Sequence, residues 1–389
     1  MKILQTFDLL SPEYGGGVVA LVNQMSKALA QKGHEVTVYT SDYKWDNKYA
    51  GSLPGVEVRP FPCWSRLAAF YFTPGMIKVT KRELGKFDVI HLNCYRNFQN
   101  IVIHHYAKKY KIPYVLEAHG ATPRFVRRRG VKWLLKWLFD VTFGKGLLRD
   151  ASRLIAETET EAGEYIEAGA SRRKIVLIPP PFDTDQFSPL PAPRLFKDRY
   201  KIKEEHIILF LGRLNWIKGL DFLVRSFHRL CQERDDVHLV IVGPDDGYKN
   251  TLVNIIDELN LSNRILFTGF LEGDEKLSAI VDADMLVQTS LHERGARSPF
   301  EMVLCNTPII VSRDTGAGEE VGRIDAGYLV EYGNTGDLIS TIQHILDNPA
   351  EAEKKTQKAK EYIIRNLSIS EGVKKYENLY KEVIEEHKE

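Results

Sequence analysis

The sequence is poor in cysteine. Only four cysteines occur among its 389 residues, and none forms a Cys-x-x-Cys pair. Neither a disulfide framework nor a cysteine-bound metal is therefore expected. Because Cys63, Cys94, Cys231 and Cys305 lie in apolar stretches, we expect buried thiols in a protein of a reducing compartment.

The sequence also lacks long apolar runs and a surplus of charge. No run approaches the roughly 20 apolar residues that span a bilayer, and the first residues have neither the basic nor the apolar region of a secretory signal. The formal net charge is +1. We expect a cytoplasmic catalytic body with no nucleic-acid partner.

Strand and helix patterns alternate through both halves of the chain, which favours parallel sheets built from β-α-β units. With 43% hydrophobic residues, 389 residues suffice for two cores. Residues 178–193 are too rich in proline for regular structure and indicate a connection. The sequence therefore predicts an α/β protein with domains over 1–181 and 182–369, followed by an amphipathic helix over 370–389.

Two cations follow a buried strand in the second half. Residues 206–230 indicate a strand, a short loop and an amphipathic helix, and the loop contains Arg213 and Lys218. Ligands of open α/β sheets bind at the carboxyl ends of the strands. Two cations held there can bind a diphosphate.

Two carboxylates flank a predicted helix start further along. Pro299 suits a first helical turn, so we predict a helix that begins near Ser298, with Glu293 in the loop before it and Glu301 inside it. The free N–H groups of this helix can hold an anion, and the carboxylates can accept hydrogen bonds from ligand hydroxyls. Arg297 is either a third cation of the site or an ordinary surface arginine.

These motifs resemble those of a known family. Gly-Arg-Leu-x-x-x-Lys-Gly, which contains Arg213 and Lys218, and Glu293-x7-Glu301 followed by Thr-Pro-Ile-Ile-Val are similar to the signatures of the retaining GT-B glycosyltransferases, specifically family 4 with its group 1 domain. The resemblance implies two Rossmann-like domains whose parallel sheets face a central cleft, the first on the acceptor side and the second binding a nucleotide sugar. It also implies that the terminal helix packs back on the first domain.

The resemblance assigns roles on the donor side. Arg213 and Lys218 would stabilise the departing diphosphate, where negative charge develops. Glu301 would bind the ribose and Glu293 the donor sugar, so neither is a nucleophile. The leaving phosphate itself would help to take the acceptor proton. Further donor-binding candidates are Gly269, Phe270, Arg297 and Ser298.

Two features of the first half also fit the family. Gly15, Gly16 and Gly17 form a predicted glycine loop after the first strand, which lets the backbone approach the phosphates or the acceptor; the alternative is a flexible helix entry. His119 ends a later strand, and by resemblance it would contact the donor sugar near the reacting centre. A histidine in such a place has a structural alternative.

Several positions depart from the family pattern, and the sequence supports neither a particular donor nor a bound metal. The family often has Gly-Phe-Gly after the first glutamate, whereas this chain has Arg-Gly-Ala-Arg over 294–297. Asn306 stands where the family usually has a glycine. Donor identity is therefore not transferable. Two Asp-x-Asp pairs occur, one in the proline-rich connection (Asp183, Asp185) and one leading a buried strand (Asp282, Asp284). The resembled family does not depend on such a motif, and we expect neither an essential metal nor a cofactor.

Residues 124–143 carry most of the information about the acceptor. On a predicted helix, Val131, Leu134, Leu135, Leu138 and Thr142 share one face. Two tryptophans fall on the other face among basic residues, the acceptor and membrane candidates being Arg127, Arg128, Arg129, Lys132, Trp133, Lys136 and Trp137. Such a face suits an anionic membrane, or the tryptophans pack on a neighbouring loop. The aromatic run over 64–72 lines the same cleft or belongs to the core.

We therefore predict a retaining transferase that moves a sugar from a nucleotide donor to a lipid-linked glycan of the cell envelope, at the inner face of the membrane. Two alternatives remain open. One is a transferase with a soluble acceptor, and the other is a sugar-nucleotide sensor without turnover. An epimerase of related fold lacks its own pattern in this sequence.

Overall fold

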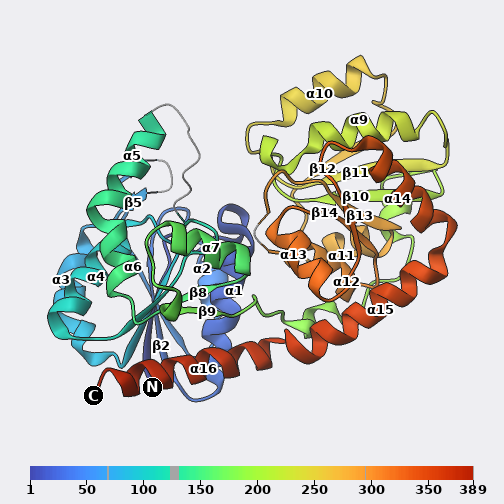
Figure 1. Cartoon of the computed structure of the whole chain (residues 1–389). Helices are drawn as coiled ribbons and strands as arrows, with labels where there is room; N and C mark the ends of the chain where they lie inside the picture. The colour runs from blue at the N-terminus through green and yellow to red at the C-terminus, as the bar shows by residue number, and fades with distance from the viewer. Residues whose placement is uncertain (68–69, 123–130, 294, 389) are drawn as a thin grey trace. The chain divides into compact units, whose positions relative to one another are not determined.

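The computed structural model contains two compact units, Met1–Phe182 with Ile369–Glu389, and Asp183–Ser368 (Figure 1). It describes residues 1–67, 70–122, 131–293 and 295–388, without the side chains of residues 12–16 and 131–133. The candidates Arg127, Arg128 and Arg129 lie outside the described residues. The side chains of Lys132 and Trp133 likewise lie outside them.

The first unit is built on a seven-stranded parallel sheet with the order β3-β2-β1-β6-β7-β8-β9. The strands are β1 (Lys2–Thr6), β2 (Glu35–Ser41), β3 (Val56–Phe61), β6 (Val89–Asn93), β7 (Tyr114–Glu117), β8 (Arg153–Ala156) and β9 (Ile175–Leu177). Successive side chains of a strand point to opposite faces. Ile3 and Val115 accordingly enter one buried cluster, whereas Leu4 and Leu116 enter another.

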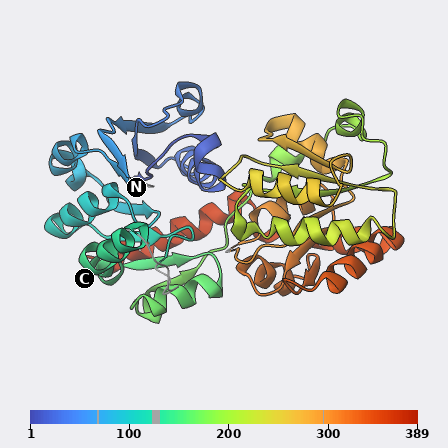
Figure 2. The same cartoon turned by 90° about the horizontal axis from the view of Figure 1, so that it is seen from above.

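Helices cover both faces of this sheet. One face packs against α1 (Pro12–Gln31) and the terminal α16 (Ile369–Glu386), and the other packs against α4 (Phe98–Tyr110) and α6 (Lys145–Asp150). In Figure 2 the red ribbon of α16 runs through the first unit although it is the end of the chain. Val373, Tyr376, Leu379, Tyr380 and Val383 of α16 are buried there, at a spacing that follows the helical period.

The second unit has a six-stranded parallel sheet with the order β12-β11-β10-β13-β14-β15. Its strands are β10 (His206–Leu211), β11 (Val237–Val242), β12 (Ile265–Gly269), β13 (Met285–Gln288), β14 (Ile309–Ser312) and β15 (Tyr328–Val330). Three helices share a buried cluster with it, α9 (Leu220–Leu230), α10 (Lys249–Glu258) and α14 (Thr335–Asp347). Asp282 and Asp284 both bind backbone groups of this unit. Asp282 accepts hydrogen bonds from the N–H groups of Phe196 and Lys197, and Asp284 accepts one from the N–H of Ile207.

Three predictions about local structure were wrong. Gly15, Gly16 and Gly17 are not a loop, because Pro12 suits a first helical turn and α1 begins there, so the glycines lie inside the helix. The proline-rich connection contains a short 3-10 helix, Thr184–Phe187. All four cysteines are free thiols, but only Cys305 is fully buried.

The predicted helix over 124–143 also differs. In the described part, α5 spans Val131–Phe139 and continues as a π-helical turn over Asp140–Gly144. Both Leu134 and Leu138 of the predicted apolar face are exposed, as is Trp137 on the other face. The buried residues come later, at Phe139 and in α6, because only the end of this segment meets the first unit.

Candidate functional site

Side chains of the second unit gather where β10 and β13 end. Lys218 closes a 3-10 turn, Trp216–Lys218, after β10, and it donates to Glu293 at 2.5 Å in the loop after β13. Glu293 also accepts a hydrogen bond from Ser290 at 3.1 Å. Only 15% of the Lys218 side chain is exposed, so the ammonium is held in place rather than moving freely in solvent.

A close backbone approach explains why these two loops meet. Gly219 follows Lys218 with φ +63°, and a Cβ atom there would lie 2.0 Å from the carbonyl oxygen of Thr289. Only glycine fits this position. The N–H of Leu291 donates to the carbonyl of Ile217 at 2.9 Å, which links the same two loops a second time. The contact between Lys218 and Glu293 therefore rests on backbone geometry as well as on charge.

Arg213 lies nearby in sequence but is differently placed. It follows β10, is 66% exposed, and donates to Asp246 at 2.9 Å. Asn215 donates to the same Asp246 oxygen, also at 2.9 Å. An exposed ion pair of this kind contributes little to stability. The guanidinium can therefore exchange Asp246 for an anionic ligand at small cost.

The predicted helix start is found within one residue. α12 spans Arg297–Leu304, with Phe300 and Val303 buried, and it carries Glu301 inside the helix as expected. Glu301 accepts from Lys276 of α11 (Gly273–Val281) at 2.5 Å, and Arg297 lies 3.7 Å from its other oxygen. Ser298 belongs to the first turn of α12.

Two groups of this edge were missed from the sequence. Asp246 lies in a loop after β11, the neighbour of β10, and it contacts Arg213. Lys276 lies on α11 after β12, a helix that no motif marks, and it contacts Glu301. Gly269 ends β12 with φ +77°, and Phe270 follows it with a partly exposed ring. The structure thus places all the predicted donor-side residues of the second unit at the carboxyl ends of strands or at the helix that follows.

In the first unit, His119 follows β7 but its side chain points inward. The imidazole is 1% exposed; its Nε2 lies 2.8 Å from Asn93 Oδ1 and its Nδ1 lies 3.2 Å from Glu157 Oε1. Burial alone would lower the pKa of His119, but the carboxylates of Glu117 and Glu157 outweigh it and raise this pKa to about 9. Its backbone, with φ +46°, is the part that meets solvent.

The loop around His119 is held by a second layer of hydrogen bonds. Glu161 of α7 (Glu159–Glu167) accepts from the N–H groups of Gly120 and Glu157, at 2.8 and 2.9 Å. Tyr165 accepts from the N–H of Ala118 at 2.8 Å. A left-handed conformation costs a non-glycine residue on the order of 1 kcal/mol or more. These bonds maintain that conformation.

Asp8 is a further group that the sequence did not indicate. It follows β1, which is the neighbour of β6 in the sheet, and His119 is close enough for its charge to affect it. Burial raises the pKa of Asp8 to about 6, an effect that its own backbone N–H and His119 partly oppose. In the sequence, Asp8 is marked only by its position just after the strand β1.

Among the described residues, two groups of three side chains could hold a metal ion by distance. They are Glu117, His119 and Glu157, and, at the opposite edge of the other sheet, Glu205, His206 and Asp236. Members of the first group already form ion pairs with one another. Neither group contains Asp183, Asp185, Asp282 or Asp284.

The segment over 131–144 carries exposed apolar side chains on more than one side of the helix. Its exposed members, which we call the α5 face, are Leu134, Leu135, Trp137, Leu138, Val141 and Phe143. Figure 1 shows α5 extending beyond the rest of the first unit. Among described residues, no helix combines the length and apolar character that a membrane span requires.

The root of this segment is fixed. Arg96 makes two hydrogen bonds to Asp140, at 2.8 and 2.7 Å. The backbone of Gly144 lies so close to the side chain of Tyr95 that a Cβ atom on Gly144 would be 2.1 Å from the tyrosine oxygen. The α5 face is therefore held on a rigid base.

A hairpin packs against the end of α5. β4 (Ser65–Leu67) and β5 (Phe70–Phe72) pair antiparallel, and the ring of Phe70 packs edge-on against Phe139 at 6.5 Å between centroids. The aromatic run over 64–72 is thus divided, with Tyr71 buried and Trp64 74% exposed.

Comparison with known proteins places both units in one enzyme class. A family model described as Glycosyltransferase Family 4 matches residues 15–186, and one described as Glycosyl transferases group 1 matches residues 193–363. A 2-deoxystreptamine glucosyltransferase of Streptomyces kanamyceticus is 29% identical over 226 residues, which cover 57% of this chain and 58% of the relative. This chain therefore matches little more than half the length of that protein.

Longer alignments exist with other proteins. A D-inositol 3-phosphate glycosyltransferase of Mycolicibacterium smegmatis is 26% identical over 365 residues, covering 88% of this chain and 82% of the relative. The crystal structure of Anabaena HepE in complex with UDP and glucose superposes with a TM-score of 0.80 at 18% identity, covering 98% of this chain and 100% of that chain. At this identity the likeness shows the fold, which is GT-B.

The environment of Asp8 gives a prediction about pH. In the folded protein the pKa of Asp8 is raised from 3.8 to about 6, so ionisation of this carboxyl lowers the free energy of unfolding. This loss of stability is absent below about pH 4 and complete above about pH 6. We expect Asp8→Asn to stabilise the protein at pH 8, by about 1 to 3 kcal/mol, and to leave it unchanged at pH 4. Thermal unfolding at both pH values measures this.

Asp88→Asn is the matched control, because Asp88 lies at the opposite end of β1 and bonds the N–H of Lys2. It should show no gain at pH 8. An equal effect of Asp8→Asn at both pH values would contradict the burial of an ionisable carboxyl.

Proposed function

We propose that the chain is a retaining glycosyltransferase of the GT-B type that moves a sugar from a nucleoside diphosphate to a lipid-linked glycan. The observation that carries the donor half is the contact between Lys218 and Glu293, beside Arg213, at the carboxyl ends of β10 and β13. In open α/β sheets this edge is where ligands bind.

The chemistry requires both signs of charge at this edge. Breaking the bond between sugar and diphosphate leaves negative charge on the phosphate, which Lys218 and Arg213 stabilise. Glu293 is within reach of Lys218, so a donor bound there places its phosphate by the ammonium and its sugar hydroxyls by the carboxylate. Glu301, inside α12 and paired with Lys276, takes the ribose hydroxyls.

UDP is the first nucleotide to test. The Anabaena HepE structure holds UDP and glucose, and this chain shares its fold. Thermal unfolding with UDP, GDP and ADP identifies the base, because a ligand that binds the folded state raises the unfolding temperature. If none of the three raises it, the donor assignment fails.

The α5 face supports a lipid-linked acceptor. Covering one exposed leucine contributes about 1.5 to 3 kcal/mol, and four apolar side chains of α5 are exposed together, Leu134, Leu135, Trp137 and Leu138. The sequence has a basic run over 124–129 immediately before this helix, and Lys132 and Lys136 lie within the helix. Apolar side chains next to cations are suited to the headgroup layer of an anionic membrane. The catalytic body is then a cytoplasmic one bound at the inner surface.

A soluble acceptor is the second candidate, and a specific observation favours it. The names of the two relatives point to 2-deoxystreptamine and D-inositol 3-phosphate, both small polar molecules. A sensor without turnover is the third. Release of UDP in the presence of donor distinguishes the sensor from either transferase.

The first prediction of this proposal concerns the two cations. Replacing Lys218 or Arg213 with Ala removes a charge-assisted bond to the diphosphate, at a cost on the order of 2 to 3 kcal/mol. We expect binding of the nucleoside diphosphate to weaken about 30- to 150-fold, measured by calorimetry, and turnover to be nearly lost.

Arg234→Ala is the matched control for Arg213→Ala. Arg234 is also ion-paired, with Asp236 and Asp347, but it precedes β11 and so lies at the amino-terminal edge of the same sheet. Its replacement should leave nucleotide binding unchanged. Full activity of both Lys218→Ala and Arg213→Ala would rule out the diphosphate clamp.

The second prediction concerns stereochemistry. If transfer occurs with retention, an α-linked donor gives an α-linked product. The anomeric proton coupling of the product, or for manno sugars the one-bond carbon–proton coupling, reads the linkage directly. A β-linked product would remove the retaining assignment while leaving the fold and the donor site intact.

The third prediction concerns the α5 face. Wild-type protein should float with anionic liposomes at low ionic strength, and the binding should weaken but persist as salt screens the charges. Trp137→Ser with Leu138→Ser should leave only a weak component that salt abolishes. Lys132→Glu with Lys136→Glu should abolish binding at low salt, because each cation contributes about 1 kcal/mol at such a surface.

Trp216→Ser is the control, because Trp216 is a similarly exposed tryptophan of the other unit, 48% against 46% for Trp137. It should float like wild type. If wild-type protein does not float, or if Trp137→Ser with Leu138→Ser floats as well as wild type, the soluble acceptor becomes the better proposal.

A further inference from the structure

A buried carboxylate lies directly behind His119. Glu117 ends β7, is 1% exposed, and its Oε1 lies 3.6 Å from Nδ1 of His119. An unpaired charge at this depth would cost several kcal/mol. Glu117 therefore needs partners, and the structure shows where they come from.

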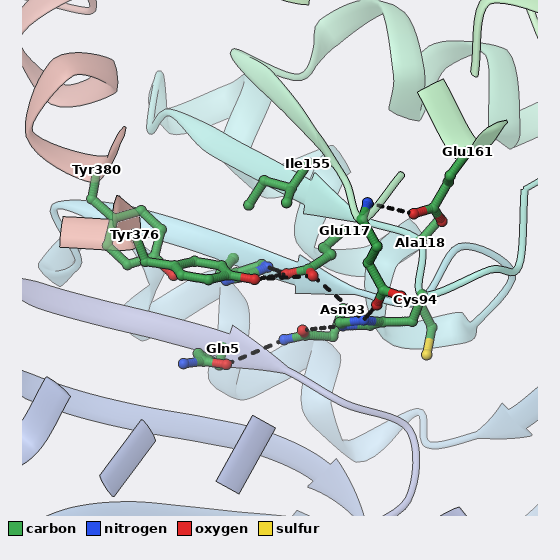
Figure 3. A network of polar contacts seen from close by, with 12 residues as sticks. Gln5, Asn93, Cys94, Glu117, Ala118, Ile155, Glu161, Tyr376 and Tyr380 are labelled. Carbon is green, nitrogen blue, oxygen red and sulfur yellow. Dashed lines mark hydrogen bonds and ion pairs between the residues drawn. The ribbon is translucent and has the colours of Figure 1, made fainter. Parts of the chain in front are cut away.

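Its main partner comes from the end of the chain. The hydroxyl of Tyr376 in α16 lies 3.0 and 2.9 Å from the two oxygens of Glu117. Figure 3 shows Tyr376 reaching the Glu117 carboxylate from the side opposite to Glu161. These two residues are 259 positions apart in the sequence.

A histidine completes the enclosure. His91 of β6 lies 3.2 Å from Glu117 Oε2, and its other ring nitrogen lies 2.7 Å from the hydroxyl of Tyr380. The imidazole stacks on Tyr376 at 5.7 Å. Two successive turns of α16 thus contact the carboxylate, one directly and one through His91.

The charge of Glu117 is maintained by this environment. Burial acts to raise the pKa of Glu117, but His119, His91 and Tyr376 outweigh it and the pKa is lowered. The ionisable groups that act on His119 come from several elements of the first unit. They are Glu117 of β7, Glu157 after β8, Glu161 of α7 and Asp8 after β1.

We propose that Glu117 is a positioning residue for His119, and that Tyr376 of the terminal helix holds Glu117 in place. His119 Nδ1 lies 3.2 Å from Glu157 Oε1 and 3.6 Å from Glu117 Oε1, and Asn93 faces Nε2 of the same ring, so the imidazole is fixed from both sides and carries both protons. The amide of Asn93 donates to Gln5 at 3.3 Å, which leaves its oxygen for the imidazole.

The inference deepens the proposed function, since it rests on the role that the family resemblance implies for His119, which is to contact the donor sugar. The order of contacts is Tyr376 to Glu117 to His119. Neither Tyr376 nor Glu117 touches substrate. A terminal helix that only closed a hydrophobic core would need neither the tyrosine hydroxyl nor the carboxylate.

The test follows the titration of His119 in the full chain without substrate. Protein with ¹⁵N-labelled histidine is titrated by NMR, and the signal of His119 is assigned by its loss in His119→Gln. Wild type should titrate with a pKa of about 9. Glu117→Gln keeps the shape but removes the charge, and should lower this pKa by about one unit or more, a tenfold change in the protonation constant.

A double-mutant cycle tests the part played by Tyr376. Tyr376→Phe removes one hydroxyl and keeps the ring, and should shift the pKa of His119 by roughly half a unit. In the Glu117→Gln background the same change should have no further effect, because Tyr376 acts only through the carboxylate. Tyr114→Phe is the matched control, because this buried tyrosine of β7 bonds the carbonyl of Leu147 instead.

Two results would overturn the proposal. One is an unchanged pKa of His119 in Glu117→Gln, and the other is an equal shift by Tyr376→Phe in both backgrounds. If Glu117→Gln does not fold, Glu117→Asp keeps the charge and withdraws it by one methylene, and it should still lower the pKa. None of these measurements uses a donor or acceptor, so their failure is distinct from failure of the transferase proposal.

Discussion

The parallel direction of the strands determines where chemistry can occur in this chain. All strands of a parallel sheet end on one edge, and there the chain leaves the hydrogen-bonded ladder with free loops and helix starts. Lys218 and Glu293 lie 75 positions apart in sequence but follow β10 and β13, which are neighbours in the sheet. His119, which follows β7, meets Asn93, the last residue of β6, in the same way. Each of these contacts follows from strand order and requires no proximity along the chain.

Residues at these sheet edges have energetically unfavourable conformations or charges that residues inside the sheets do not have. His119 has a left-handed backbone, Asp8 carries a pKa raised to about 6, and Glu117 is a buried charge. The His119 and Glu117 features each cost on the order of 1 kcal/mol or more, and neighbouring groups offset the cost, such as Glu161 and Tyr165 around the His119 loop. Strain that is compensated in this way persists where it serves a site. Hydrophobic packing elsewhere in the unit supplies the necessary margin.

The sequence was sufficient for features that depend on local pattern. Strand alternation predicted the α/β class, and Pro299 predicted the start of α12 within one residue. The prediction from local pattern was wrong at the start of α1, where two local rules conflict. Pro12 favours a helix start and the glycines after it favour a loop, and the structure has the helix. Amphipathicity predicted one buried face of α5, yet Leu134 and Leu138 are exposed because burial depends on what lies opposite a helix. Likewise, no local rule connects Tyr376 to Glu117 or Lys276 to Glu301, because both pairs form only when distant elements assemble.

The same reasoning bears on the acceptor. An exposed apolar face is unfavourable for a protein that meets only water, yet α5 is not a loose segment, since Arg96 and Tyr95 fix its root in the first unit. A rigidly held face of this kind requires a binding partner more than a mobile one would, because it cannot fold away to hide its leucines. A small polar acceptor would bury none of them. Under the proposed function, a lipid surface would cover exposed side chains of the α5 face such as Leu134 and Leu138, and the basic residues of the sequence over 124–136 would favour anionic headgroups.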